Sequence, residues 1–303
     1  MSRLTANLLL ILTAIIWGST FVVQKIGAEH VSPAAFTAAR LFLGTLVVLP
    51  FALSHWRDSP RRLDRKDWAL MLATGLVMCL ASLAQQIGVG QTTVGNAGFL
   101  TGLNAPMVPL IELLFFARTP HPVIFPAAFL SLLGTYLMSG GSLDLSVGDA
   151  WIVVSSVFWA MHIILVGHAA KRSGLPTVLA VVQYVISAVL CSAWAWIAEP
   201  PAWDGLQAAW MEIFYIGVIE VGLAYTLQTI TQRYTNAADA AVIFSGEMLF
   251  SAVGGMLFLG ERMTLIQALG GAAILTAMLA VQLGPILRLR KTEERTVPEK
   301  TVL

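Results

Sequence analysis

The sequence contains little charge and has long stretches with none. Only 12% of its 303 residues are Asp, Glu, Lys or Arg, and 57% are hydrophobic. In an ordinary soluble domain about a quarter of the residues are charged. A soluble chain of this size cannot hide so much apolar surface, because surface-to-volume scaling keeps many residues at the surface. The composition therefore excludes a soluble enzyme, a secreted scaffold and a disordered regulator, and it indicates a polytopic membrane protein.

Cysteine is scarce, and the motifs of several enzyme classes are missing. Cys79 and Cys191 lie in apolar runs, so we expect buried hydrophobic side chains and neither a disulfide nor a metal site. The sequence has no P-loop, H-E-x-x-H or G-x-S-x-G motif, and its histidines are scattered. It also lacks a basic patch interleaved with aromatic residues. We therefore expect no enzymatic activity, cofactor, metal or nucleic-acid partner.

Ten apolar stretches are long enough to cross a bilayer as helices, which takes about 20 residues. Their residues are apolar all round, whereas barrel strands alternate apolar and polar residues, so we expect an all-α protein. The predicted spans are residues 4–24, 33–53, 69–89, 92–116, 123–140, 149–168, 175–197, 209–230, 236–259 and 264–284.

Lys and Arg are distributed unevenly between the two sides of these spans. With the N-terminus in the cytoplasm, fifteen fall in cytoplasmic segments, only Lys25 and Arg262 fall outside, and Arg40 lies within a span. Short loops rich in Lys and Arg stay on the cytoplasmic side of a membrane. The sequence therefore predicts a multi-pass protein of the cell inner (plasma) membrane with both termini in the cytoplasm.

The two halves of the chain resemble each other at an offset of 142 to 143 residues. The offset of 142 aligns Trp17 with Trp159, Trp68 with Trp210, Gly75 with Gly217, and Gln86 with Gln228. We therefore expect two five-helix repeats, at residues 4–140 and 149–284, and a basic cytoplasmic tail at 285–303.

An odd number of helices in each repeat inserts the second repeat upside down relative to the first. Inverted repeats are typical of secondary transporters, which bind substrate near the membrane midplane between the repeats. Two similar halves can exchange conformations, so the inward-open and outward-open states have similar energies. The repeat therefore predicts transport by alternating access.

Several short motifs carry a family resemblance. The sequence WGSTF at 17–21 resembles the W-G-S/T-x-F signature of EamA-type members of the drug/metabolite transporter superfamily, and Trp159 stands at the equivalent place in the second repeat. The ninth span reads SGEM at 245–248 and then LGER at 259–262, similar to the family's L-E-P and L-G-E-R, with Met248 in place of proline. The fourth span keeps Pro106 but has alanine in place of the family's glutamate.

This resemblance covers about residues 8 to 284. It implies ten helices in two inverted repeats and the export of small metabolites, such as amino acids, or of drugs. Exporters of aromatic amino acids belong to this superfamily, and the chain resembles that branch.

Charged side chains within predicted spans are costly in a bilayer and are usually functional. Arg40 lies roughly 10 Å into the second span, so it either pairs with a carboxylate or helix-end carbonyls, or attracts a substrate carboxylate. Glu247 lies mid-span, where it binds a substrate ammonium group, carries a coupling proton, or makes a structural hydrogen bond or ion pair. Glu112 and Glu220 are further candidates for coupling or charge pairing.

Two other acidic residues, Glu212 and Asp239, lie near the ends of predicted spans. We expect both to reach water. Pro106 and Pro109 predict a kink in the fourth span, because proline frees backbone carbonyls, and such a kink could act as a hinge.

Aromatic and amide side chains from several spans suit an amphipathic substrate such as an aromatic amino acid. Trp and Tyr also mark membrane interfaces, which is the alternative for these residues. His162 either titrates near neutral pH or is structural. The predicted substrate-binding residues are Trp17, Gln86, Asn104, Trp159, His162, Tyr225, Gln228, Phe244 and Glu247.

The sequence thus predicts an all-α membrane carrier that exports small amphipathic metabolites, with aromatic amino acids favoured. The alternatives are efflux of drugs or organic cations, nucleotide-sugar or nucleoside exchange, and, from other classes, an intramembrane enzyme or a receptor. The predicted spans contain three acidic candidates and one basic residue. This excess of acidic residues suits a carrier of cations or a proton-coupled carrier, and a uniporter also fits. The expected partners are a small-molecule substrate and the lipid bilayer, with the chain either a monomer or a homodimer.

Overall fold

The computed structural model describes residues 1–116, 121–138, 146–200, 202–250 and 264–296, with side chains up to residue 281. Within these ranges every regular element is a helix. The prediction of an all-α protein is therefore confirmed for the described part of the chain.

Seven helices are long and apolar enough to cross a membrane, and they correspond to predicted spans one to four and six to eight. They are α1 (Arg3–Gly27), α2 (Pro33–Asp58), α3 (Arg65–Gln91), the α4–α5 segment (Val94–Phe115), α7 (Val147–Ser173), α8 (Pro176–Ala198) and the segment Trp210–Thr231. This last segment consists of α10 (Trp210–Tyr215), the π-helix η1 (Ile216–Tyr225) and α11 (Thr226–Thr231).

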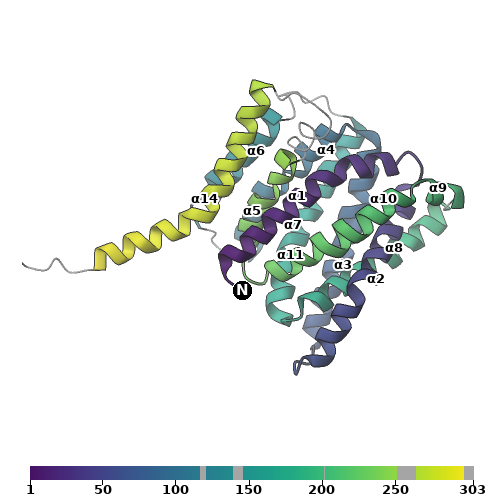
Figure 1. The fold of residues 1–303 in the computed structure, drawn as a ribbon, viewed down its shortest axis with the longest axis horizontal. Helices are drawn as coiled ribbons and strands as arrows, with labels where there is room; N and C mark the ends of the chain where they lie inside the picture. Colours follow the sequence, from purple (N-terminus) through teal and green to yellow (C-terminus); the bar gives the residue numbers. More distant parts are fainter. Residues whose placement is uncertain (117–120, 139–145, 201, 251–263, 297–303) are drawn as a thin grey trace, which may run out of the picture.

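The other predicted spans are described only in part or by shorter apolar helices. The fifth is α6 (Ile124–Met138), and the ninth begins with α12 (Ala237–Phe244), while its residues 251–259 lie outside the described residues. The tenth is α14 (Leu265–Thr296), whose apolar part is Leu265–Val281. The helix of α14 continues through much of the predicted tail and extends beyond the bundle (Figure 1). The count of ten spans stays a prediction.

Local sequence signals explain where several helices begin and end. Pro33 and Pro176, which are 143 residues apart, occupy the first turns of α2 and α8, where a missing N–H costs nothing. The side chains of Asp64 and Ser146 form capping boxes at the starts of α3 and α7. Gly174 ends α7 in the left-handed conformation with φ 70°, which glycine adopts without steric cost.

Helices from the two predicted repeats pack against each other in pairs. The main pairs are α3 with α7, α2 with α8, and α6 with α14, and the last two pairs lie on opposite sides of the bundle in Figure 1. Glycines allow close approach, since a Cβ at Gly88 would lie 2.8 Å from the carbonyl oxygen of Gly148. The same packing brings the Sγ atoms of Cys79 and Cys191 to 3.5 Å, with both thiols free and buried.

Two helices are interrupted at matching positions. The fourth predicted span breaks at Gly102 and Leu103, between α4 (Val94–Thr101) and α5 (Asn104–Phe116), and the ninth breaks at Ser245 after α12. Pro106 explains the first break, because it has no N–H for the carbonyl of Gly102 and its ring crowds that carbonyl. Ser245 follows Gly102 by 143 residues, the offset of the sequence repeat.

Candidate functional site

A cavity lies between the first, third, fourth, sixth, eighth and ninth predicted spans. The space open to the centres of water-sized molecules within it is about 30 Å³ in this state. Both helix breaks border it, through Thr101 and Asn104 in the fourth span and Glu247 in the ninth. The lining residues are Trp17, Thr20, Phe21, Gln24, Gln85, Thr101, Asn104, Trp159, Ile163, Glu220, Tyr225, Gln228 and Glu247.

Three aromatic rings form one wall of this cavity. The rings of Trp159 and Tyr225 are stacked, with centroids 5.7 Å apart and planes 14° apart. Trp17 lies against Tyr225 at 5.1 Å and against Phe244 at 4.7 Å. Because these three rings come from α1, α7 and η1, the wall joins both predicted repeats.

A buried ion pair stands beside the aromatic wall. Nη1 of Arg40 lies 3.4 Å from both carboxylate oxygens of Glu220, and the two side chains are only 1% and 2% exposed. The Tyr225 hydroxyl donates to Oε1 of Glu220 at 3.3 Å. The π-helical backbone makes this contact possible, because its hydrogen bonds join residues five apart and bring their side chains together. Arg40 therefore pairs with a carboxylate, the first of the two alternatives for this residue.

Several polar atoms of the cavity side chains are buried without a hydrogen-bond partner among the described residues. The donors are Nε1 of Trp17, Nε1 of Trp159 and Nε2 of Gln228, and the acceptors are Oε1 of Gln24, Oδ1 of Asn104 and Oε1 of Gln228. A buried polar group without a partner costs free energy of about 1–3 kcal/mol. Such atoms are suited to a polar ligand or to water that occupies the cavity.

The structure brings most of the predicted substrate-binding residues to this one cavity. Six of them line it, as does the coupling candidate Glu220: Trp17, Asn104, Trp159, Tyr225, Gln228 and Glu247.

The remaining candidates lie behind the lining or elsewhere. Gln86 turns away and donates from Nε2 to the carbonyl of Gln24 at 3.1 Å, while its neighbour Gln85 lines the cavity. His162 is buried, with Nε2 3.0 Å from Oε1 of Gln183 and its ring edge-on to Trp159. Phe244 supports the ring of Trp17.

Three further candidates belong to the fourth span. Glu112 is buried in α5 and is not a lining residue, and Pro106 and Pro109 belong to the first turns of the same helix, after the break. The predicted kink coincides with the turn at Gly102 and Leu103, whose backbone N–H groups still bind carbonyls of α4.

Sequence reasoning missed several lining residues. Thr20 and Gln24 follow Trp17 by three and seven residues, so the helical period could have placed them on the same face. Whether Gln85 or Gln86 faces the cavity depends on how α3 is rotated about its axis, and the mostly apolar sequence around them does not specify that rotation.

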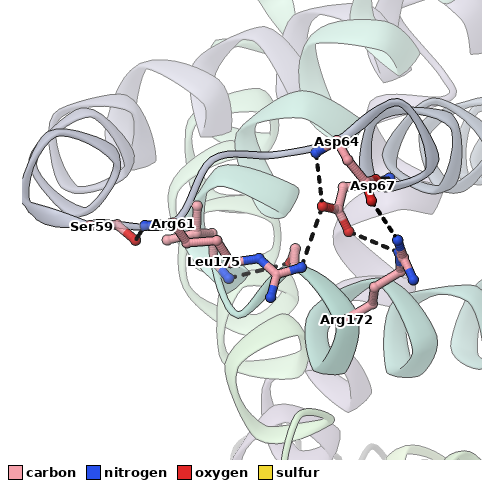
Figure 2. A network of polar contacts seen from close by, with 7 residues as sticks. Ser59, Arg61, Asp64, Asp67, Arg172 and Leu175 are labelled. Atoms are coloured by element: carbon pink, nitrogen blue, oxygen red, sulfur yellow. Dashed lines mark hydrogen bonds and ion pairs between the residues drawn. The ribbon is translucent and has the colours of Figure 1, made fainter.

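Ion pairs join several helix ends where α1 begins. Nη2 of Arg172, in the last turn of α7, lies 2.7 Å from Asp64, and its Nε lies 3.0 Å from the buried Asp67 (Figure 2). Arg61 reaches Asp67 at 3.4 Å. The pKa of Asp64 is lowered below its ordinary value of 3.8, first by the backbone N–H of Asp67 and also by the Arg172 guanidinium.

Another ion pair lies at the same end of the bundle, and it corrects one expectation. Nη2 of Arg3 lies 2.6 Å from Oδ2 of Asp239, whose side chain is only 4% exposed. The expectation that Asp239 reaches water is therefore wrong, because the N-terminal turn of α1 packs over it. Glu212 is partly exposed, but its Oε2 atom is buried. Nζ of Lys171 links this region to the Arg172 network by donating to Asn236 at 3.4 Å.

The described residues contain no group of three or more His, Cys, Asp or Glu side chains placed to hold a metal ion. The charged groups of the cavity instead suit the binding of a charged or zwitterionic organic molecule, because they lie beside aromatic faces and unpartnered amides.

Comparison with known proteins gives a consistent result. The model of the EamA-like transporter family matches residues 4–140 and 146–282. An uncharacterized transporter of Archaeoglobus fulgidus is 31% identical over 281 residues, covering 93% of this chain and 87% of that protein. The threonine/homoserine exporter RhtA of Salmonella typhimurium is 29% identical over 269 residues, covering 84% and 82%. A solved crystal structure with 18% identity has the same fold, with a TM-score of 0.77, covering 95% of this chain and 99% of the other.

Proposed function

The chain belongs to the EamA-like transporter family, and we propose that it is a secondary transporter that exports small amphipathic metabolites, amino acids in the first place. Family membership supports the transport of a small metabolite, and two exporters of Salmonella typhimurium and Escherichia coli that resemble the chain carry threonine and homoserine. The direction of transport is proposed from these exporters, and the choice of substrate is argued from the cavity.

The observation that carries this proposal is the pair of interrupted helices at the cavity. Secondary transporters with repeats typically bind substrate where transmembrane helices are discontinuous, because the interruption exposes polar groups within the membrane. Here the breaks at Gly102 and Ser245 are 143 residues apart, and each is followed by a polar lining residue, Asn104 or Glu247. A structural packing role alone would not require unpartnered polar atoms on Asn104 and on other lining side chains.

The ion pairs at the start of α1 support an alternating-access mechanism. With both termini in the cytoplasm, Arg3–Asp239 and Arg172–Asp64 join the two inverted repeats at the cytoplasmic end of the bundle. The described state would then be closed towards the cytoplasm, and the cavity would open inwards when these pairs separate. The inner membrane, the ten spans and the cytoplasmic termini are parts of this proposal.

The aromatic wall favours aromatic amino acids as substrates. The faces of Trp17, Trp159 and Tyr225 offer stacking surfaces, and offset or edge-to-face aromatic contacts contribute about 0.5–1.5 kcal/mol beyond area burial. Threonine and homoserine form the second candidate class, because the RhtA relatives export them and the cavity also presents amide groups.

Glu247 is the proposed coupling residue, should transport depend on protons. Its carboxyl group lines the cavity from the interrupted ninth span, so substrate and proton would compete for one group. Glu220 is less suited to this role, because Arg40 holds it in a buried pair.

A counterflow assay with purified protein tests the proposal. Vesicles loaded with unlabelled phenylalanine should take up labelled phenylalanine faster than empty vesicles at equal pH, with threonine as the competing substrate. Glu29→Gln, which alters a residue outside the cavity lining, should behave like the unmodified protein. Uptake that is no faster than in protein-free vesicles, for both phenylalanine and threonine, would contradict the proposal.

A further inference from the structure

We propose that the cavity recognises its substrate by an ammonium group and does not require a carboxylate. The inference rests on the proposed function and extends the substrate class to aromatic primary amines, such as decarboxylated aromatic amino acids. Its basis is the sign of the charges that line the cavity together with the place of the aromatic rings.

The ionisable side chains that line the cavity, apart from Tyr225, are acidic. Glu220 and Glu247 line it, whereas no Lys or Arg is found among the described lining residues. Arg40 is the basic group of the buried pair, but it is not a lining residue, and its Nη1 contacts Glu220. Arg40 offsets the charge of one carboxylate only, so a second positive charge within the cavity would have Glu247 as its partner.

The aromatic wall strengthens this preference. A cation within about 6 Å of an aromatic face is attracted by the electrons of the ring, most strongly by Trp. Trp17, Tyr225 and Trp159 present adjacent rings with centroids 5.1 Å and 5.7 Å apart in the same cavity as Glu247. An ammonium group can therefore contact ring faces and a carboxylate together. It can also donate to the unpartnered oxygens of Gln24 and Asn104.

A substrate carboxylate meets a weaker environment. The unpartnered donors of the lining are neutral, namely Nε1 of Trp17, Nε1 of Trp159 and Nε2 of Gln228. At the start of α5, the N–H groups of Ala105 and Met107 bind carbonyls at the helix break, and Pro106 has no N–H. Hydrogen bonds between neutral groups and a carboxylate lack the second charge that makes an Arg–carboxylate pair strong.

The test measures binding of three labelled compounds to the purified full-length protein by scintillation proximity. Phenylalanine carries both charged groups, 2-phenylethylamine carries only the ammonium group, and 3-phenylpropionate carries only the carboxylate. Glu247→Gln tests the partner of the ammonium group, and Glu212→Gln is the matched control, a carboxylate at the start of the eighth span outside the lining.

We expect 2-phenylethylamine to bind at least as tightly as phenylalanine, and 3-phenylpropionate to bind at least about tenfold more weakly, the effect of one charged hydrogen bond. Glu247→Gln should weaken the binding of 2-phenylethylamine by roughly tenfold or more, and Glu212→Gln should leave it unchanged. The ligand series on the unmodified protein decides the question even if Glu247→Gln fails to fold.

The other outcomes separate the two proposals. If phenylalanine binds but 2-phenylethylamine does not, or if 3-phenylpropionate binds as well as phenylalanine, ammonium recognition is wrong while an aromatic amino-acid carrier stands. If 2-phenylethylamine binds and phenylalanine does not, ammonium recognition stands and the amino-acid substrate is wrong. If none of the three compounds binds, both proposals fail for aromatic substrates.

Discussion

The buried pair of Arg40 and Glu220 should give a strongly non-additive double-mutant cycle. Coulomb's law with an effective dielectric constant of 20 gives an attraction of about 5 kcal/mol for unit charges at the observed 3.4 Å. Burial offsets much of this attraction, because both groups lose their hydration. Each charge nevertheless depends on the other, since the two side chains are almost fully buried.

Removing one partner leaves the other charge buried and unpaired. We expect Arg40→Met and Glu220→Gln each to lower the free energy of unfolding by about 3–5 kcal/mol. Replacing both residues should cost much less than the sum, because no charge then remains. The Tyr225 hydroxyl can still donate to the Oε1 atom of a glutamine at 220, so the hydrogen bond survives in that variant.

The assay is the free energy of unfolding of the purified protein in mixed detergent micelles, titrated with a denaturing detergent. Four proteins complete the cycle: the unmodified chain, each single variant and the double variant. Additive losses, in which the double variant loses the sum of the two single losses, would refute the reasoning and show that the two charges are solvated independently.

Four further predictions concern the aromatic wall, the packing, the ion pairs and the topology. Trp159→Ala should lower the affinity for phenylalanine by about 0.5–1.5 kcal/mol or more with little change for threonine, and equal losses for both would assign the ring to packing. Gly88→Ala should destabilise the protein by about 1–3 kcal/mol in the same unfolding assay, because its Cβ would lie 2.6 Å from Ile152 and 2.8 Å from the Gly148 carbonyl. The pKa of Asp64 is lowered from 3.8 in the folded chain, so its carboxylate should stabilise the fold fully above pH 3.8 and progressively less at lower pH. The difference in unfolding free energy between the unmodified protein and Asp64→Asn should therefore vanish in strong acid, and a difference that persists there would be the contrary result. Tags at either terminus should resist labelling from outside intact cells, and labelling of either one would overturn the proposed orientation.

The fold follows from sequence features that a membrane-spanning helix requires. Spanning helices need long apolar runs because backbone groups cannot stay unpaired in lipid, so seven described helices coincide with predicted spans. Helix ends were also readable, as at Pro33 and Pro176, where proline favours a first turn. The interruption at Gly102 was less accessible, because Pro106 predicts a disturbance of the helix but not its extent.

The cavity was predictable in its main residues and not in its details. Trp17, Trp159 and Glu247 were identifiable because aromatic and charged residues in mid-span have few structural reasons to be there. Two features could not be predicted from the sequence. The π-helical geometry that joins Tyr225 to Glu220 leaves no local signature, and the pairing of Arg3 with Asp239 depends on how the first and ninth spans pack.

The most direct test of the account is two-sided access to one lining position. In a chain whose buried Cys79 and Cys191 are replaced by serine, Asn104→Cys would be treated with a membrane-impermeant thiol reagent in intact cells and, separately, in inside-out vesicles. Alternating access predicts labelling of this position from both sides, with protection by substrate in each preparation. Labelling from one side only, with or without substrate, would contradict a cavity that opens alternately to the two sides of the membrane.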